Sequence, residues 1–274
     1  DEIEAMFEGA DGHIYVVSTE NGICELDPTE SEVRHLFKLP EGTVLIDAHF
    51  DRGRWIWLAT TSGVWRYDLL GTASIRISEN RDDKFGLWGG YVTCVFTDRS
   101  GGLWVGTKDC GVNWSGVFQN NFEKHCDASG KTLAGSIVDG FAEDGRGNLY
   151  VTTEQQGLLK YDEKQKTLKR VEHPDIPNSL CSPVSCGTGL WMGSLYGVCR
   201  FDPVSGKVKN YNLRKNAGGL NDPRAFTVFR SASDRIFAGS SLGLLEYDRD
   251  SDSFVDTGLF EGEHITSMSE DIDG

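Results

Sequence analysis

Short apolar runs separated by polar turns fill the chain, without the periodicity of an amphipathic helix. One run recurs: an apolar residue, an aromatic ring and further apolar or small residues, followed by a few polar residues and a glycine. The ring is in turn Tyr15, Trp57, Trp104, Tyr150, Trp191 and Phe237, at intervals of 41 to 47 residues. Self-similarity at such an interval indicates an array of similar structural units.

Each repeat predicts four short strands, here called A to D. The aromatic run is strand B, and the glycine that follows it permits the backbone angles of a tight hairpin into strand C. Strand C closes on an apolar residue and an aspartate in five of the six repeats, and an alternating strand D follows, as at 207–211. Strand A precedes the aromatic run, as at 92–98, and ends in a turn rich in Asp and Gly.

A single four-stranded sheet cannot bury both of its faces, so successive units must stack around an axis. Four-stranded units of this length are typical of β-propeller blades. The sequence therefore predicts an all-β fold, a β-propeller of four-stranded antiparallel blades that forms a single domain over 1–274. Six repeats are complete, and residues 265–270 are expected to be the innermost strand of a seventh. We interpret the chain as a fragment of a longer multidomain protein and as part of a seven-bladed propeller.

Two segments, 98–114 and 143–162, closely resemble the "two-component regulator propeller" repeat. The resemblance extends over all six repeats and is strongest in these two. It implies the periplasmic sensor of a Bacteroides-type hybrid two-component histidine kinase, in which a second propeller, an immunoglobulin-like domain, a membrane helix and the kinase belong to the same chain. Sensors of this family recognise oligosaccharides. Similar blades also occur in glycoside hydrolases and in streptogramin lyase-like proteins.

Charge and cysteine usage narrow the possible partners. The chain has 27 basic and 42 acidic residues, a net charge of −15, which disfavours nucleic acid as a partner. Its seven cysteines show no CxxC spacing, so neither a zinc site nor a disulfide framework is indicated. Cys24 and Cys199 occupy the same position of two repeats, where they are expected to be small core residues. Cys181 and Cys186 could pair in an oxidising compartment. We predict no cofactor and no metal.

Catalysis would need chemical groups that stand apart from the repeat. Asp98 and Asp144, which could suggest a pair of hydrolytic carboxylates, lie at the same repeat position in the turn after strand A. A feature shared by several blades is better explained as a turn-former. We therefore predict no catalytic residues in this segment.

Residues that break the repeat are the better candidates for ligand binding, because loops held by a rigid scaffold are where binding usually occurs. By analogy with other propellers, they should lie on the B–C hairpins and on the connections between blades, around the mouth of a central channel. An indole or phenol ring could stack on a sugar, and charged and amide groups could bind hydroxyls. Docking against another domain is the alternative for the rings, and an ordinary solvated loop is the alternative for the rest. The candidates are Trp88, Tyr91, Lys108, Asp109, Glu154, Gln155, Tyr196, Asn221 and Arg224.

The function predicted from these observations is a ligand-sensing periplasmic propeller that binds an oligosaccharide, or supports its binding, and signals to a cytoplasmic histidine kinase. The neighbouring propeller and the immunoglobulin-like domain are the expected partners within the chain, and a homodimer is possible. The alternatives are a glycoside hydrolase or lyase propeller and a protein-interaction scaffold.

Overall fold

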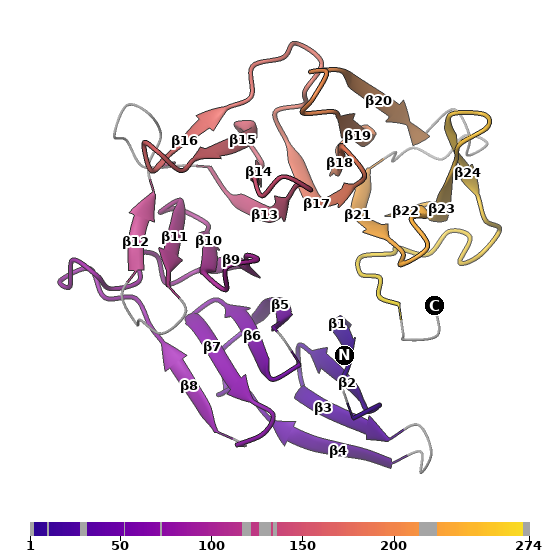
Figure 1. The fold of residues 1–274 in the computed structure, drawn as a ribbon. Coiled ribbons are helices and arrows are strands. Elements are labelled where there is room, and N and C mark those ends of the chain that lie inside the picture. Colours follow the sequence, from indigo (N-terminus) through magenta and orange to yellow (C-terminus); the bar gives the residue numbers. More distant parts are fainter. Residues whose placement is uncertain are drawn as a thin grey trace. The chain divides into compact units, whose positions relative to one another are not determined.

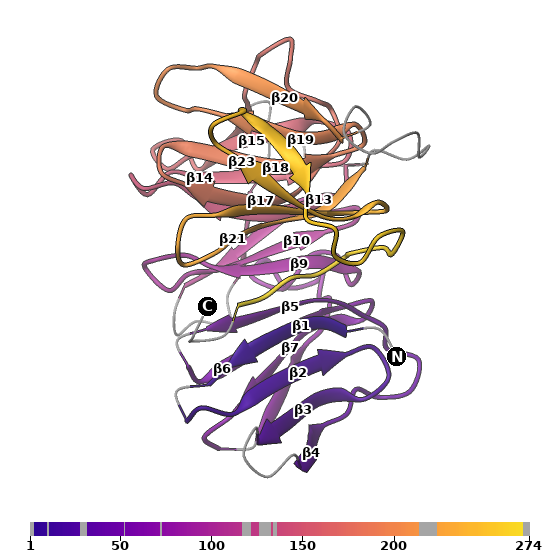
Figure 2. The same ribbon diagram turned by 90° about the vertical axis from the view of Figure 1, so that its right-hand side faces the viewer.

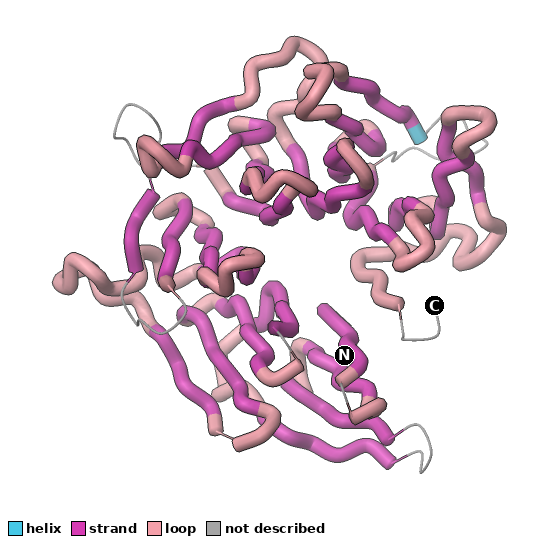
Figure 3. The backbone as a smooth tube through the Cα atoms, in the orientation of Figure 1, coloured by secondary structure: helices cyan, strands magenta, loops and turns pink. Residues whose placement is uncertain are grey.

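The computed structural model describes residues 3–9, 11–27, 32–51, 53–71, 73–116, 122–125, 133, 136–213 and 224–270. These residues form six four-stranded antiparallel sheets (Figures 1 and 3) and contain no α-helix, only a single 3₁₀-helical residue, Leu213. The predicted all-β propeller of four-stranded blades is therefore confirmed, with six blades. Within the described ranges, no helix is long and apolar enough to cross a membrane.

Each blade consists of four consecutive strands, paired in sequence order. Figure 2 shows this order most clearly in blade 1. Blade 1 comprises β1 (Ile3–Glu8), β2 (Ile14–Ser18), β3 (Gly22–Asp27) and β4 (Glu32–Phe37). Blade 2 comprises β5 (Leu45–Asp51), β6 (Trp55–Thr60), β7 (Gly63–Asp68) and β8 (Ser74–Ile77). Blade 3 comprises β9 (Val92–Thr97), β10 (Leu103–Thr107), β11 (Val112–Ser115) and β12 (Phe122–His125). Blade 4 comprises β13 (Val138–Glu143), β14 (Leu149–Thr153), β15 (Gly157–Asp162) and β16 (Thr167–Arg170). Blade 5 comprises β17 (Leu180–Cys186), β18 (Gly189–Ser194), β19 (Gly197–Phe201) and β20 (Val208–Asn212). Blade 6 comprises β21 (Ala225–Arg230), β22 (Ile236–Ser240), β23 (Gly243–Asp248) and β24 (Ser253–Asp256).

The chain divides into two compact units, and the boundary falls at Val138 in β13. In the first unit, β1 contacts β5 and β5 contacts β9, so the first strands of successive blades lie side by side. In the second unit, β17 and β21 have the same relationship. Strand A is therefore the innermost strand within each unit, as the repeat predicted.

Polar side chains near the start of strand A join it to the next blade. The Asp47 carboxylate accepts a hydrogen bond from the Val95 backbone N–H at 3.0 Å, and the Ser182 hydroxyl accepts one from the Val228 N–H at 3.1 Å. The two bonds join equivalent positions of neighbouring blades. Burial raises the pKa of the Asp47 carboxyl, so this contact is made in a poorly solvated place.

The repeated aromatic residues of strand B are core residues, as predicted. All are buried except Phe237, which is half-buried. The hairpin glycines all have positive φ, between 69° and 126°. At Gly63 and Gly197 a side chain would also collide with the backbone carbonyl of Ile77 or Tyr211, at 2.3 and 2.1 Å, so only glycine fits.

The cysteines agree with the core interpretation. Cys24 and Cys199 are buried. Cys181 and Cys186 are both free thiols, and Cys181 donates a hydrogen bond to the Ala225 carbonyl at 3.3 Å. The disulfide that these two could have formed is not present.

The expected strand over 265–270 is wrong, because these residues form no strand ladder. Ile265 nevertheless occupies the place of an inner-strand residue. Its carbonyl lies 2.6 Å from the position of a Cβ on Gly239, as the Ala225 carbonyl does from Gly193 one blade earlier. Its N–H donates to the Ser240 carbonyl at 3.1 Å. A ladder needs a strand B beside it, and no described strand pairs with this segment.

Candidate functional site

Within each unit, the B–C hairpins and the connections between blades meet at one end, here called the hairpin end. In the first unit the Lys108 N–H donates to the Tyr91 carbonyl at 3.1 Å. In the second unit the Gly157 N–H donates to the Asn178 carbonyl at 2.8 Å. Both bonds join a B–C hairpin to the blade connection beside it. The predicted arrangement of these loops is thus found in each unit taken by itself.

Trp88 lies on the connection between blades 2 and 3, and its backbone is held by a buried amide. Asn113, on β11, accepts from the Trp88 N–H and donates to the Trp88 carbonyl, both at 3.0 Å. The next residue, Gly89, has a φ of 95°. The indole is half-buried, and the Lys124 ammonium lies 3.9 Å from its ring centroid. A cation therefore already covers part of this ring, so a sugar could stack only on the surface that remains.

Tyr91, Lys108 and Asp109 form the exposed part of the first unit's hairpin end. The Lys108 ammonium lies 4.8 Å from the Tyr91 ring centroid, and 37% of Tyr91 is exposed. Lys108 and Asp109 are exposed on the neighbouring hairpin. The structure thus brings together a ring, a cation and a carboxylate, which suit contacts with a hydroxyl-rich ligand.

The candidates of the second unit lie on separate hairpins and connections. Glu154 and Gln155 are exposed on the β14–β15 hairpin, and Tyr196 is 67% exposed on the β18–β19 hairpin. Arg224 is exposed, and its guanidinium lies 5.2 Å from the centre of the Phe226 ring. Asn221 lies outside the described residues.

Near Glu154, the inner strand β13 carries an acid that the sequence analysis did not single out. Burial, assisted by the charge of Glu154, raises the pKa of Asp139 to about 7. Its position after Val138 is the one that carries Thr93 and Cys181 in other inner strands. Both of those side chains donate hydrogen bonds to carbonyls of the next blade.

The acidic residues of the A–B turns have the structural role that the repeat predicted. Asp98 accepts from Ser100 Oγ at 2.6 Å, the Gly102 N–H at 2.8 Å and the Trp104 indole N–H at 2.8 Å. Asp144 accepts from the backbone N–H groups of Arg146 and Asn148, both at 2.9 Å. These bonds hold the pKa of both carboxyls below the ordinary value, although burial alone would raise it.

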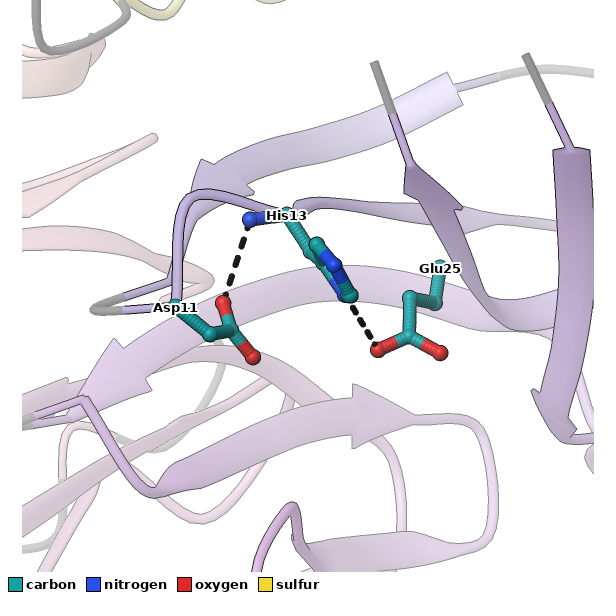
Figure 4. Close-up of side chains that lie close together, drawn as sticks. All are labelled: Asp11, His13 and Glu25. Atoms are coloured by element: carbon teal, nitrogen blue, oxygen red, sulfur yellow. Dashed lines mark hydrogen bonds and ion pairs between the residues drawn. The ribbon is translucent and has the colours of Figure 1, made fainter. Parts of the chain in front are cut away.

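Asp11, His13 and Glu25 in blade 1 form a cluster whose ligand atoms lie within 4.8 Å of one another (Figure 4). Two carboxylates and an imidazole could hold a divalent metal ion, but each is already bonded within the protein. His13 Nδ1 lies 2.9 Å from Glu25 Oε1, and Asp11 Oδ2 accepts from the Tyr15 hydroxyl at 2.8 Å. The bond to Glu25 raises the pKa of His13.

Blade 6 shows what the His13–Glu25 contact does. Tyr15 pairs with Glu25 across β2 and β3, as Phe237 pairs with Glu246 across β22 and β23. The position of His13 is therefore that of Arg235, which binds both carboxylate oxygens of Glu246 at 2.7 Å. We interpret the pair in blade 1 as the same cross-strand ion pair, with a histidine in place of arginine.

One pocket at the hairpin end of the second unit was missed. It has a volume of about 520 Å³ and lies on the connection between blades 4 and 5, bounded by Arg170, Glu172, His173, Pro174, Ile176, Pro177 and Asn178. This connection differs from those of the other blades in containing two prolines, Pro174 and Pro177. The two prolines were the sequence signal from which a distinct site on this connection could have been predicted.

The comparisons with known proteins agree with the repeat analysis. Residues 86–109 match the model of a family described as the two component regulator propeller. This segment is therefore a repeat of that family, and the resemblance predicted from the sequence is confirmed there. It contains Trp88, Tyr91, Lys108 and Asp109. No curated protein matches the chain.

Several solved structures share the fold. The extracellular domain of a hybrid two-component system from B. thetaiotaomicron has a TM-score of 0.73 at 17% identity, and the match covers 95% of this chain and 36% of that one. Another extracellular domain from the same organism, described as that of a one-component system, gives 0.73 at 14% identity, with 96% and 35% covered. Virginiamycin B lyase from Staphylococcus aureus gives 0.72 at 10% identity, with 92% and 82% covered. At these identities the likeness establishes the propeller fold. The chain spans about a third of the length of the two B. thetaiotaomicron structures.

Proposed function

We propose that this chain is a sensor propeller of a hybrid two-component regulator, and that it binds an oligosaccharide, or supports its binding, at the hairpin end. The match to the regulator propeller at residues 86–109 carries the proposal, because the matched segment joins a repeated blade to the non-repeating Trp88 connection. The fold shared with extracellular domains of bacterial regulators supports a periplasmic location. The kinase belongs to another part of the parent chain, and this segment acts by binding.

The chemistry of the hairpin end supports a hydroxyl-rich ligand. A pseudo-symmetric scaffold can bind an asymmetric ligand only where its side chains differ from blade to blade. In the first unit, Trp88 and Tyr91 offer ring surface, and Lys108 and Asp109 offer a donor and an acceptor. In the second unit, Glu154, Gln155, Tyr196 and Arg224 offer the same kinds of group. Asn221 belongs to the same proposed set.

Signalling would proceed by a shift between domain arrangements. A ligand that contacts this propeller and a neighbouring domain stabilises one arrangement only by the difference between its affinities for the two. The second propeller and the immunoglobulin-like domain are the proposed neighbours, and a homodimer would offer a further contact. A ligand that binds both arrangements equally would not signal.

A thermal-shift screen of an oligosaccharide library against the intact ectodomain tests the proposal. A ligand present at 100 times its dissociation constant stabilises the protein by about 2.7 kcal/mol. Removing the ring in Trp88→Ala should weaken binding by about 2 kcal/mol. Trp55→Ala is the matched control, because Trp55 begins β6 at the opposite end of its blade. Absence of binding to any oligosaccharide, or turnover of the bound glycan, would overturn the proposal.

A further inference from the structure

We propose that the pocket on the connection between blades 4 and 5 is a binding subsite for an uncharged saccharide. The inference rests on the proposed function and names the class of sugar that this part of the hairpin end would take. The pocket volume of about 520 Å³ lies in the range of small-molecule sites, about 300–1,000 Å³. It is an open depression, so it would hold one end of a longer chain and leave the rest in solvent.

The wall of the pocket is held in place before any ligand arrives. The Asn178 carbonyl accepts from the Gly157 N–H at 2.8 Å, and Asn210 Nδ2 donates to the Asp175 carbonyl at 2.7 Å. Ile176 is buried, and its N–H donates to the His173 carbonyl at 3.2 Å. Prolines on both sides of this anchor restrict the backbone further. A preformed wall lowers the entropy cost of binding.

The polar groups of the pocket can both donate and accept. Arg170 Nη2 donates to Asn178 Oδ1 at 2.6 Å, and this bond uses only one of the five N–H donors of the guanidinium. His173 Nδ1 accepts from the Asp175 N–H at 3.2 Å, which leaves Nε2 as the ring nitrogen that can donate to a ligand. Glu172 is exposed and adds an acceptor. A carboxylate beside several donors suits neighbouring hydroxyl groups, each of which both donates and accepts.

Charge and shape then select among ligands. Arg170 and Glu172 cancel each other, and the chain as a whole has a net charge of −15, so the pocket offers no excess positive charge for a uronic acid or a sulfate. Pro174, Ile176 and Pro177 supply apolar surface but no aromatic ring. Recognition would therefore depend on hydroxyl hydrogen bonds, with the prolines against the C–H face of the sugar.

The pocket adjoins a hairpin that the sequence analysis had already selected. Glu154 and Gln155 lie on the β14–β15 hairpin, whose Gly157 is bonded to Asn178. A saccharide held in the pocket could extend over this hairpin. The two groups of residues would then form one continuous surface within the second unit.

Calorimetry on the intact protein tests the inference with two probe panels, neutral oligosaccharides and oligosaccharides that contain uronic acid. Arg170→Gln and Glu172→Gln should each weaken binding of a neutral oligosaccharide about 10- to 100-fold, the loss expected for a hydrogen bond to a charged group. The matched control is Glu163→Gln, an exposed carboxylate on the C–D turn of the same blade, which should leave affinity unchanged. Circular dichroism and melting temperature should show that all three variants are folded.

The outcomes separate this inference from the proposed function. If a neutral oligosaccharide binds and both pocket variants bind it as well as the unaltered protein does, the pocket is not the subsite and the sensor function stands. If only acidic oligosaccharides bind, and Glu172→Gln tightens them, the assignment to uncharged sugars is wrong. If no oligosaccharide binds, the proposed function fails and the subsite fails with it.

Discussion

Replacing Trp104 with alanine tests the interpretation of the repeated aromatics as core residues. The ring is 4% exposed, and its centroid lies 5.3 Å from that of His125 and 6.3 Å from that of Trp114. Its indole N–H donates to Asp98 at 2.8 Å. Removing a buried ring of this size leaves a cavity and costs about 3–5 kcal/mol.

Part of this cost is the hydrogen bond, which Trp104→Phe removes together with part of the ring volume, so a double-mutant cycle is needed to separate the two. Asp98 keeps its bonds from Ser100 and Gly102, so it is not left without partners. A hydrogen bond to a charged acceptor contributes about 1.5–3 kcal/mol. A double-mutant cycle of Trp104→Phe with Asp98→Ala should therefore show a coupling of this order.

Urea denaturation, followed by fluorescence and circular dichroism, measures these free energies of unfolding. Trp88→Ala is the control, because its half-buried ring lies on a connection and should change stability by less than about 1 kcal/mol. If Trp104→Ala lowers the free energy of unfolding by less than about 1 kcal/mol, the Trp104 ring is not the buried core residue that we infer.

Three further predictions concern pH and stability. Asp139 has a pKa of about 7 in the fold against an ordinary value of 3.8, so the free energy of unfolding should fall as pH rises from about 4 to 7. Denaturant titrations of Asp139→Asn should show a free energy of unfolding up to about 4 kcal/mol higher than that of the unaltered protein at pH 8, and almost no difference at pH 4. A variant that gains as much at pH 4 as at pH 8 would refute this. His13 has a raised pKa, so its contribution to stability is fully present below pH 6.5 and is lost as pH rises through the pKa of the folded protein. Arginine stays charged over this range, so His13→Arg should show a smaller fall in melting temperature between pH 6 and pH 9 than the unaltered protein does. Asn113→Ala removes both bonds to the Trp88 backbone, so it should lower the free energy of unfolding by about 1–3 kcal/mol and speed hydrogen exchange of that loop. Unchanged exchange would show that the Asn113 amide does not hold the loop.

The fold was predictable because its determinants are local and repeated. The hairpin glycine, the strand B aromatic and the Asp turn recur in blade after blade, so weak individual signals reinforce one another. The turn role of Asp98 and Asp144 followed from the same logic. Residues 265–270 have the inner-strand pattern, but a strand also requires a partner beside it, which pattern alone does not supply.

The site was predictable only as a set of loops. The bonds between Asn113 and Trp88 join residues on different elements, and no spacing rule anticipates them. The equivalence of His13 with Arg235 appears only once cross-strand register is known, and the Arg170 pocket depends on how two prolines shape a connection. Contacts that do not recur in every blade depend on tertiary packing, and a repeat pattern cannot predict them.

Hydrogen exchange of the intact ectodomain, with and without a bound oligosaccharide, tests the central claim most directly. If the hairpin end is the ligand face, protection should appear at the Trp88 connection, residues 85–91, or at the β14–β15 hairpin and residues 171–179. The turns that contain Asp98 and Asp144 should exchange as before. Protection confined to those turns, or none anywhere on this propeller, would contradict the account.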